Sequence, residues 1–156
     1  MKSDPQVIQH LNAQLKNELT ATNQYFLHYR MLKHWGFDKL AKKEYEESIG
    51  EMKHADELIE RILYLEGIPN VQRLGKVNVG QTVPEQFRLD LELERAALRM
   101  LNDAIELCRN LADAGSRELL EHILKNEESH VNWLEAQLAL IEQVGEGNYL
   151  AQQIKS

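Results

Sequence analysis

Two Glu-x-x-His pairs, Glu51 with His54 and Glu127 with His130, each place a carboxylate and an imidazole three residues apart. In an α-helix, residues at that spacing share one face, so both side chains of a pair can reach the same ion. Carboxylate oxygen and imidazole nitrogen suit iron or manganese, and zinc or cobalt can substitute. A single pair of this kind is a weak signal, because a chain rich in glutamate also contains such pairs by chance.

Two further glutamates lie at matching positions. Glu18 precedes Glu51 by 33 residues, and Glu94 precedes Glu127 by the same distance. In an antiparallel helical hairpin, residues equidistant from the turn face each other. The midpoint of the first pair falls beside Gly36, and the midpoint of the second falls just before the next turn. Each lone glutamate is therefore expected to lie level with one Glu-x-x-His pair.

Four long segments with apolar residues at alternating steps of three and four must position these side chains. Asp4-Pro5 is typical of a helix start, and Gly36 and Gly67 are typical of helix ends. Strand-like alternation is absent, so the predicted fold class is all-α. The expected helices cover residues 5–35, 38–66, 82 or 83 to 111, and from the 113–116 turn to 144, followed by a short fifth helix over 148–154.

The connection over residues 67–83 sets the expected topology. Its 17 residues can reach about 55 Å at ~3.3 Å each, whereas a helix of about 28 residues is ~42 Å long. The connection can therefore run the length of the bundle as a crossover, which would make helices two and three parallel. We expect one domain over residues 1–156, a size that suits a single core.

On each helix the apolar stripe that must form the core is interrupted by one of the four glutamates. Buried carboxylates are costly unless something compensates them. Two divalent ions would balance four such charges, and six side chains would leave coordination positions open. Four-helix bundles with dinuclear iron or manganese carboxylate sites use this ligand set. The predicted metal and catalytic residues are Glu18, Glu51, His54, Glu94, Glu127 and His130.

Composition excludes other classes of function. The net charge is −7, with a pI near 5.4, so nucleic-acid binding is not expected. No apolar run approaches the ~18 residues that a membrane span needs, and no signal peptide is visible. Cys108 is the single cysteine, which excludes an internal disulfide and favours a cytoplasmic location.

The sequence resembles the bacterioferritin family over almost its whole length. The resemblance rests on Glu18, Glu94, the segment Glu51-Met52-Lys53-His54-Ala55-Asp56 and the Glu127/His130 pair, with support from residues 23–28, 65–70 and 148–150. It implies a cytoplasmic 24-subunit cage built from two-fold dimers, which oxidises Fe(II) at a dinuclear iron ferroxidase centre and stores Fe(III) mineral. It also implies one haem b per dimer, with Met52 as an axial ligand from each side.

Some features extend or limit this resemblance. Family members that hold an extra iron on the inner surface have histidine and aspartate where this chain has Glu46 and Gly50. The accessory site therefore stays open, with Glu46 and Glu47 as its remaining candidate ligands. A second bacterioferritin subunit type and a ferredoxin reductant are further partners that the resemblance allows. Independently, helix two carries a second apolar stripe, which predicts contact with another subunit: Tyr45, Ile49, Met52, Ile59 and Leu63.

Alternatives from other classes stay open at this point. One is a dinuclear oxidoreductase without storage, such as a manganese catalase-like enzyme. Another is a helical scaffold without catalysis. For His28 the sequence predicts a surface or hydrogen-bonded packing role. Asp90 is expected either on the helix surface or as the acceptor of a ligand histidine's N–H.

Overall fold

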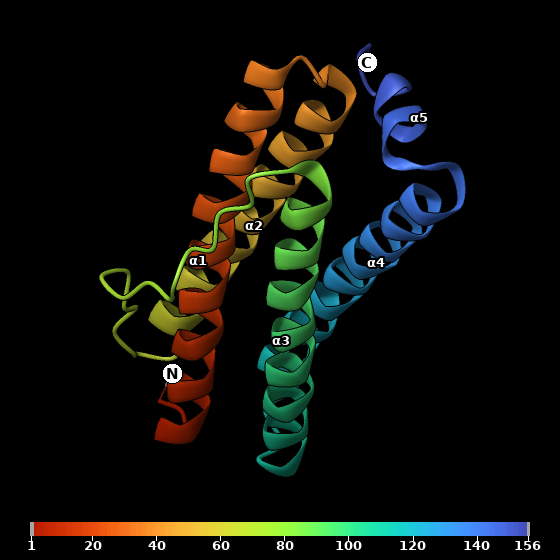
Figure 1. Ribbon diagram of the computed structural model, residues 1–156. Coiled ribbons are helices and arrows are strands. Elements are labelled where there is room, and N and C mark those ends of the chain that lie inside the picture. Colours follow the sequence, from red (N-terminus) through yellow and green to blue (C-terminus); the bar gives the residue numbers. More distant parts are fainter. Residues whose placement is uncertain (1, 156) are drawn as a thin grey trace.

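The computed structural model describes residues 2–155, which form five α-helices and no strand (Figure 1). This confirms the predicted all-α class, a four-helix bundle followed by a short C-terminal helix. The helices are α1 (Pro5–Trp35), α2 (Asp38–Tyr64), α3 (Val83–Asn110), α4 (Ala114–Val144) and α5 (Glu146–Ala151).

The first and third helices begin at the caps that the sequence indicates. The Asp4 side chain accepts a hydrogen bond from the Gln6 N–H, and Pro5 occupies the first helical position. Thr82 does the same for α3 by accepting from the Glu85 N–H. Gly36 ends α1 with φ near 90°, a left-handed conformation that glycine adopts without strain.

Several helix boundaries differ from the prediction. The second helix ends at Tyr64 rather than at residue 66, because Glu66 adopts φ near 63° and the Gly67 N–H turns back to the Ile62 carbonyl at 2.9 Å. The fourth helix already begins at Ala114, since the Asp113 side chain caps it by accepting from the Ser116 N–H. The fifth helix spans Glu146–Ala151 rather than 148–154.

The long connection after α2 is the crossover that the sequence permits. Figure 1 shows it running along the bundle from the end of α2 to the opposite end, where α3 begins, so α2 and α3 are parallel. The two hairpins, α1 with α2 and α3 with α4, are antiparallel. Helix α1 packs against α2 and α3, and α4 packs against α2, α3 and α5.

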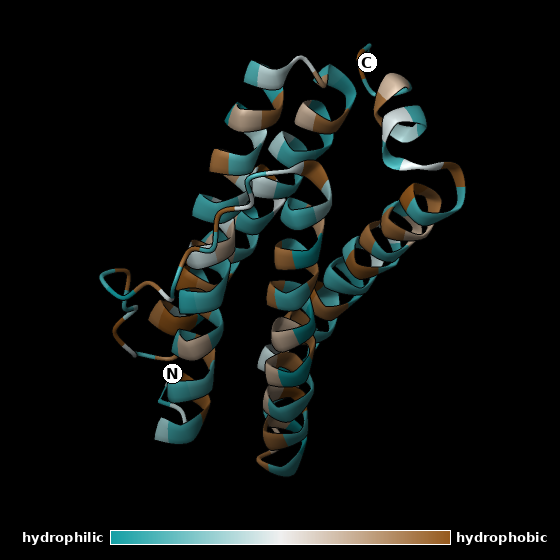
Figure 2. Ribbon diagram, viewed as in Figure 1, coloured by the Kyte–Doolittle hydropathy of each residue, from teal (hydrophilic) through white to brown (hydrophobic). Residues whose placement is uncertain are grey.

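The core has two apolar parts. One is formed around Leu11, Leu58 and Leu101, and the other around Leu32, Phe87 and Leu134. Hydrophobic and hydrophilic residues are interspersed along each long helix, as Figure 2 shows. Between the two apolar parts lies a layer of buried polar side chains, which includes all six predicted metal ligands. Within residues 2–155, no helix is both long and apolar enough to cross a membrane.

Candidate metal centre

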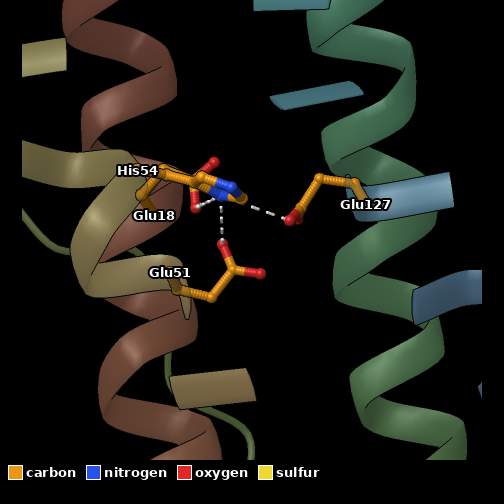
Figure 3. A group of neighbouring side chains, drawn as sticks. All are labelled: Glu18, Glu51, His54 and Glu127. Atoms are coloured by element: carbon orange, nitrogen blue, oxygen red, sulfur yellow. Dashed lines mark ion pairs between the residues drawn. The ribbon is translucent and has the colours of Figure 1, made fainter. Parts of the chain in front are cut away.

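Four of the predicted ligands converge on one point of the core. Figure 3 shows Glu18 of α1, Glu51 and His54 of α2, and Glu127 of α4 turned toward one another. The His54 Nδ1 atom lies 3.4 Å from Glu18 Oε2, 3.7 Å from Glu51 Oε2 and 3.5 Å from Glu127 Oε1. One ligand atom from each of the four residues lies within 4.8 Å of the others, a separation that a metal ion can bridge.

The remaining two predicted ligands form the other side of the cluster. The His130 Nδ1 atom lies 3.2 Å from Glu94 Oε2 and 3.5 Å from Glu47 Oε2. Glu47 is partly exposed and pairs with Lys43 at 2.9 Å, whereas Glu94 and His130 are buried. The Tyr25 ring packs edge-on against the His130 ring, with 5.2 Å between centroids. The two hairpins therefore contribute one glutamate and one Glu-x-x-His pair each, as their matched spacings predict.

The hydrogen bonding of these six residues is incomplete. Buried polar atoms in folded proteins nearly always have a partner. Here each of the six predicted ligands keeps one buried atom without a hydrogen bond. These atoms are Glu18 Oε2, Glu51 Oε2, His54 Nδ1, Glu94 Oε1, Glu127 Oε2 and His130 Nε2. This donor set of carboxylate oxygens and imidazole nitrogens suits divalent iron or manganese.

Burial and mutual repulsion shift the pKa values of these groups. Burial, followed by the charges of Glu51 and Glu94, raises the pKa of Glu127 well above its usual value. Burial and the charge of Glu94 also raise the pKa of Glu51. Burial alone would lower the pKa of His130, but its hydrogen bond to Glu94 and the charges of Glu94, Glu47 and Asp90 together outweigh this and raise that pKa to about 9. Without a cation the cluster therefore retains protons at neutral pH.

Two supporting contacts were not apparent from the sequence. The Asn126 side-chain amide hydrogen-bonds the His54 Nε2 atom at 3.0 Å, and the Gln14 amide donates to Glu18 Oε1 at 2.9 Å. Such contacts fix the orientation of a ligand side chain. Gln14 carries a weak sequence signal, because it lies one helical turn before Glu18, whereas Asn126 directly precedes Glu127 and has no such spacing.

Met52, the predicted haem ligand, lies apart from this cluster. Its side chain is 49% exposed, on the outer side of α2. It borders a groove of about 580 Å³ between α1 and α2, lined by Phe26, Leu27, Arg30 and Ile49 among others. Tyr45 and Leu63 of the same stripe are also exposed, while Ile59 is partly buried against the core.

We call the six predicted ligands the metal-type cluster. A second buried cluster lies beside it, and the sequence did not predict this second cluster. It is formed by Gln24 and His28 of α1, Glu44 of α2 and Asp90 of α3, each at most 1% exposed. Asp90 accepts hydrogen bonds from Gln24 at 2.8 Å and from His28 Nδ1 at 3.0 Å. Asp90 therefore lies neither on the helix surface nor against a predicted ligand histidine. We call these four residues the Asp90 quartet.

Comparisons with known proteins agree with this fold and cluster. The ferritin-like domain family matches residues 8–144, which places the chain in that class of helical bundle. The bacterioferritins of Mycobacterium leprae and Mycobacterium bovis are each 49% identical over 152 residues, covering 97% of this chain and 96% of each relative. The Brucella melitensis bacterioferritin is 47% identical over 149 residues, or 96% of this chain and 92% of that relative. The chain belongs to the bacterioferritin family.

Proposed function

We propose that this protein stores iron: it oxidises Fe(II) at a dinuclear ferroxidase centre and keeps the Fe(III) product as a mineral inside a 24-subunit cage. The observation that carries the proposal is the set of six buried, unpartnered donor atoms, one on each predicted ligand. Family membership supports storage as the outcome of the chemistry.

In this proposal the six side chains bind the substrate ions. Glu18 with His54 holds one Fe(II), and Glu94 with His130 holds the other. Glu51 and Glu127 bridge the two ions, because each carboxylate has two oxygens and the two metals of such a site lie ~3.5–4 Å apart. Two Fe(II) ions bring four positive charges, which balance the four carboxylates. Dioxygen or peroxide, as the oxidant, accepts the electrons.

Before iron arrives, the same side chains hold protons. The raised pKa values of Glu51, Glu127 and His130 mean that the empty centre retains protons which Fe(II) must displace. Asn126 and Gln14 keep His54 and Glu18 aimed inward during this exchange. The apolar core on either side keeps water away from the ions.

The test is Glu51→Ala, with Glu60→Ala as the matched control. Both remove a carboxylate from α2, but Glu60 is exposed. Loss of a bridging ligand should slow Fe(II) oxidation by more than about 100-fold, since even supporting contacts of metal ligands are worth 10–100-fold. Oxidation is followed by Fe(III) absorbance after stopped-flow mixing. Oxidation by Glu51→Ala at the parent rate would contradict the proposed centre.

Cage assembly is tested separately. We propose that the exposed residues around the α1–α2 groove, Phe26, Leu27, Tyr45 and Met52, are covered by a two-fold-related copy. Leu27→Glu would place a charge in that contact. In analytical ultracentrifugation this variant should sediment as single chains, with neither dimers nor cages. The parent protein should sediment as 24 copies of an 18.1-kDa chain, about 430 kDa. Parent protein that sediments as a single bundle would instead favour an oxidoreductase without storage.

Haem b is proposed for the same groove. Met52 offers an exposed thioether, the groove is mostly apolar, and Arg30 at its edge can pair with a carboxylate. Two copies of Met52 across a two-fold axis would hold one haem, which supplies one-electron transfer when bound. Met52→Leu conserves volume and apolarity but cannot ligate iron. It should abolish the haem Soret band while leaving the cage and Fe(II) oxidation unchanged, and a normal Soret band would contradict this assignment.

A further inference from the structure

The Asp90 quartet contains two carboxyl groups in direct proximity. One atom each of His28, Glu44 and Asp90 lie within 4.8 Å of one another, and Glu44 Oε1 is 3.7 Å from His28 Nδ1. All four side chains of the quartet are buried, and none belongs to the proposed ferroxidase centre. Two buried carboxyl groups at this distance cannot both be ionised without a large cost.

Two backbone N–H groups of the crossover fix which atoms face Asp90. The Asn78 N–H donates to Gln24 Oε1 at 3.1 Å, so the Gln24 NH₂ group is the end that meets Asp90. The Gly80 N–H donates to His28 Nε2 at 3.0 Å, so Nε2 is the acceptor. The His28 ring is therefore neutral, with its one proton on Nδ1, and it donates that proton to Asp90.

This arrangement leaves a proton as the group that fits between Glu44 and Asp90. Both N–H donors reach Asp90 Oδ1, while Asp90 Oδ2 and both Glu44 oxygens have no hydrogen-bond partner. A cation held by all three converging groups would need a free nitrogen of His28, and both nitrogens are already hydrogen-bonded. A proton on Glu44 lets its O–H donate to Asp90, so that the Asp90 carboxylate accepts from three donors.

The pKa shifts agree with this assignment. Burial first, then the charge of Asp90 and a hydrogen bond to it, raise the pKa of Glu44 well above its usual value. Burial alone would raise the pKa of Asp90, but hydrogen bonds from Glu44, His28 and Gln24 outweigh it and hold that pKa below its usual value. The charges of Glu47 and Glu94 raise the pKa of Glu44 further. From α4 the nearby titratable group is His130, which contacts Glu47.

The quartet lies within electrostatic reach of the ferroxidase centre. Asp90 is one helical turn before Glu94, and its charge contributes to the raised pKa values of Tyr25 and His130. The carboxylate charge of Glu94 in turn raises the pKa of Glu44. Charge added at the metal ions must therefore act on Glu44 in the opposite sense and favour its ionisation.

We propose that Glu44 is a carboxylic acid in the resting protein and that it releases its proton when the two iron ions are oxidised. This inference rests on the proposed ferroxidase function. Oxidation raises the charge of the two ions from four to six, while dioxygen takes the two electrons together with two protons from solvent and leaves as hydrogen peroxide. The Glu44 O–H bond then breaks, its electron pair stays on the carboxylate, and the proton passes to solvent. The ionised Glu44 offsets part of the added positive charge.

Infrared spectroscopy of the carboxylic acid C=O stretch tests the first half of this inference. Zn(II) is redox-inert and should remove the protons of the metal-binding glutamates but not that of Glu44. Zn(II)-loaded parent protein at pH 7 should therefore retain one carboxylic acid band. The band should be absent from Glu44→Gln, whose amide can still donate to Asp90, and present in the exposed control Glu60→Gln. Absence of the band from the parent protein would overturn the assignment.

Proton counting tests the second half. During Fe(II) oxidation in weakly buffered solution, Glu44→Gln should release about one proton fewer per dinuclear centre than the parent and Glu60→Gln. Proton release on Zn(II) binding should be the same in all three proteins. Equal release on oxidation, or a band that persists in the oxidised parent, would overturn the redox link.

If the parent fails to oxidise Fe(II), the proposed function fails instead, while the infrared result on the Zn(II)-treated or metal-free protein still decides whether Glu44 is protonated. Should Glu44→Gln not fold, titration of the parent band with pH decides the same point.

Discussion

The polar layer of this bundle contains two buried carboxylate clusters that differ in how their charge is compensated. In the Asp90 quartet, two side-chain N–H groups donate to one carboxylate oxygen, and the proposed Glu44 proton lies between carboxyl oxygens that have no other hydrogen-bond partner. In the metal-type cluster, four glutamates face two histidines, and each of the six residues keeps an unpartnered atom. The quartet therefore compensates one anion with groups of the protein itself. The proposed ferroxidase centre needs cations for the same purpose.

The largest expected difference between the clusters is the effect of removing a carboxylate from the quartet. Asp90→Asn deletes the anion that Gln24 and His28 donate to, and two hydrogen bonds to a charged group together contribute about 3–6 kcal/mol. Chemical denaturation of the metal-free protein measures this loss. Asp56→Asn, an exposed change on α2, should shift the unfolding free energy by less than about 0.5 kcal/mol. A small effect of Asp90→Asn would mean that the quartet is not a paired anion.

A somewhat smaller effect is expected where the crossover closes the quartet. A Cβ at Gly80 would lie 2.5 Å from the Gln86 backbone nitrogen, so Gly80→Ala must displace the segment that holds His28. We expect a loss of about 2–3 kcal/mol, the upper part of the ~1–3 kcal/mol range for overpacking of a buried site. Gly147→Ala is the control, because a Cβ there meets nothing within 4 Å. Thermal unfolding compares the two variants, and equal melting temperatures would contradict the close approach.

The pH dependence of stability separates the clusters more finely. The folded-state pKa values of Glu51, Glu127 and His130 are raised, so these groups hold protons that the unfolded chain releases. Their contribution is present at low pH and is lost as pH rises through the folded pKa values, which for His130 is about 9. Each such proton lowers the free energy of unfolding by up to about 1.4 kcal/mol for each unit that the pH rises. The metal-free protein should therefore melt at falling temperatures from pH 6 to 8.

Divalent metal should remove most of this pH dependence, because the ligands are then deprotonated in the folded state. A raised pKa makes stability fall as pH rises, so a falling slope that remains in the Zn(II)-loaded protein is the one expected from Glu44. That falling slope should disappear in Glu44→Gln. A metal-free protein whose melting temperature rises over this range would contradict the protonated state of the empty centre.

The smallest effect has the opposite sign. Burial and the charges of Glu51 and Glu94 raise the pKa of Glu127, so the folded protein holds a proton there that the unfolded chain releases at pH 8. Glu127→Gln removes this requirement, and the metal-free variant should be about 1 kcal/mol more stable than the parent at pH 8. The same variant should lose most of the stabilisation that Zn(II) gives the parent protein. Glu128→Gln, the adjacent exposed change, should do neither. Destabilisation of metal-free Glu127→Gln would contradict the raised pKa of Glu127 and show that its carboxylate is stabilised without a metal ion.

The sequence predicted one of these clusters and missed the other for a physical reason. The metal-type cluster repeats one spacing in both hairpins and uses residue types with a known ligand chemistry. The quartet uses each of its residues once, and two of its contacts run to backbone N–H groups of an irregular segment, which no side-chain pattern reveals. One signal was available: His28 and Glu44 lie eight residues on either side of Gly36, so they must be level in the hairpin.

Helix boundaries were predicted to within a few residues where a capping side chain begins the helix or a glycine ends it. Gly36 and Thr82 act through local hydrogen bonds or local conformation, and both were apparent. The end of α2 was not apparent from the sequence, because Glu66 adopts a left-handed conformation that glutamate rarely takes. The start of α5 was placed too late, since Gly147 lies inside that helix rather than before it.

The crossover also has a consequence for the order of folding. Each hairpin is closed by a short turn, and contacts between residues near in sequence form faster than distant ones. We therefore expect α1 with α2, and α3 with α4, to pair before the 65–82 segment brings the two hairpins together. Glu18, Glu51 and His54 come from the first hairpin, and Glu94, Glu127 and His130 from the second. A metal ion that needs both sets of ligands would therefore bind only after the last step of refolding. The rate of metal binding during refolding would then equal the rate at which the two hairpins dock.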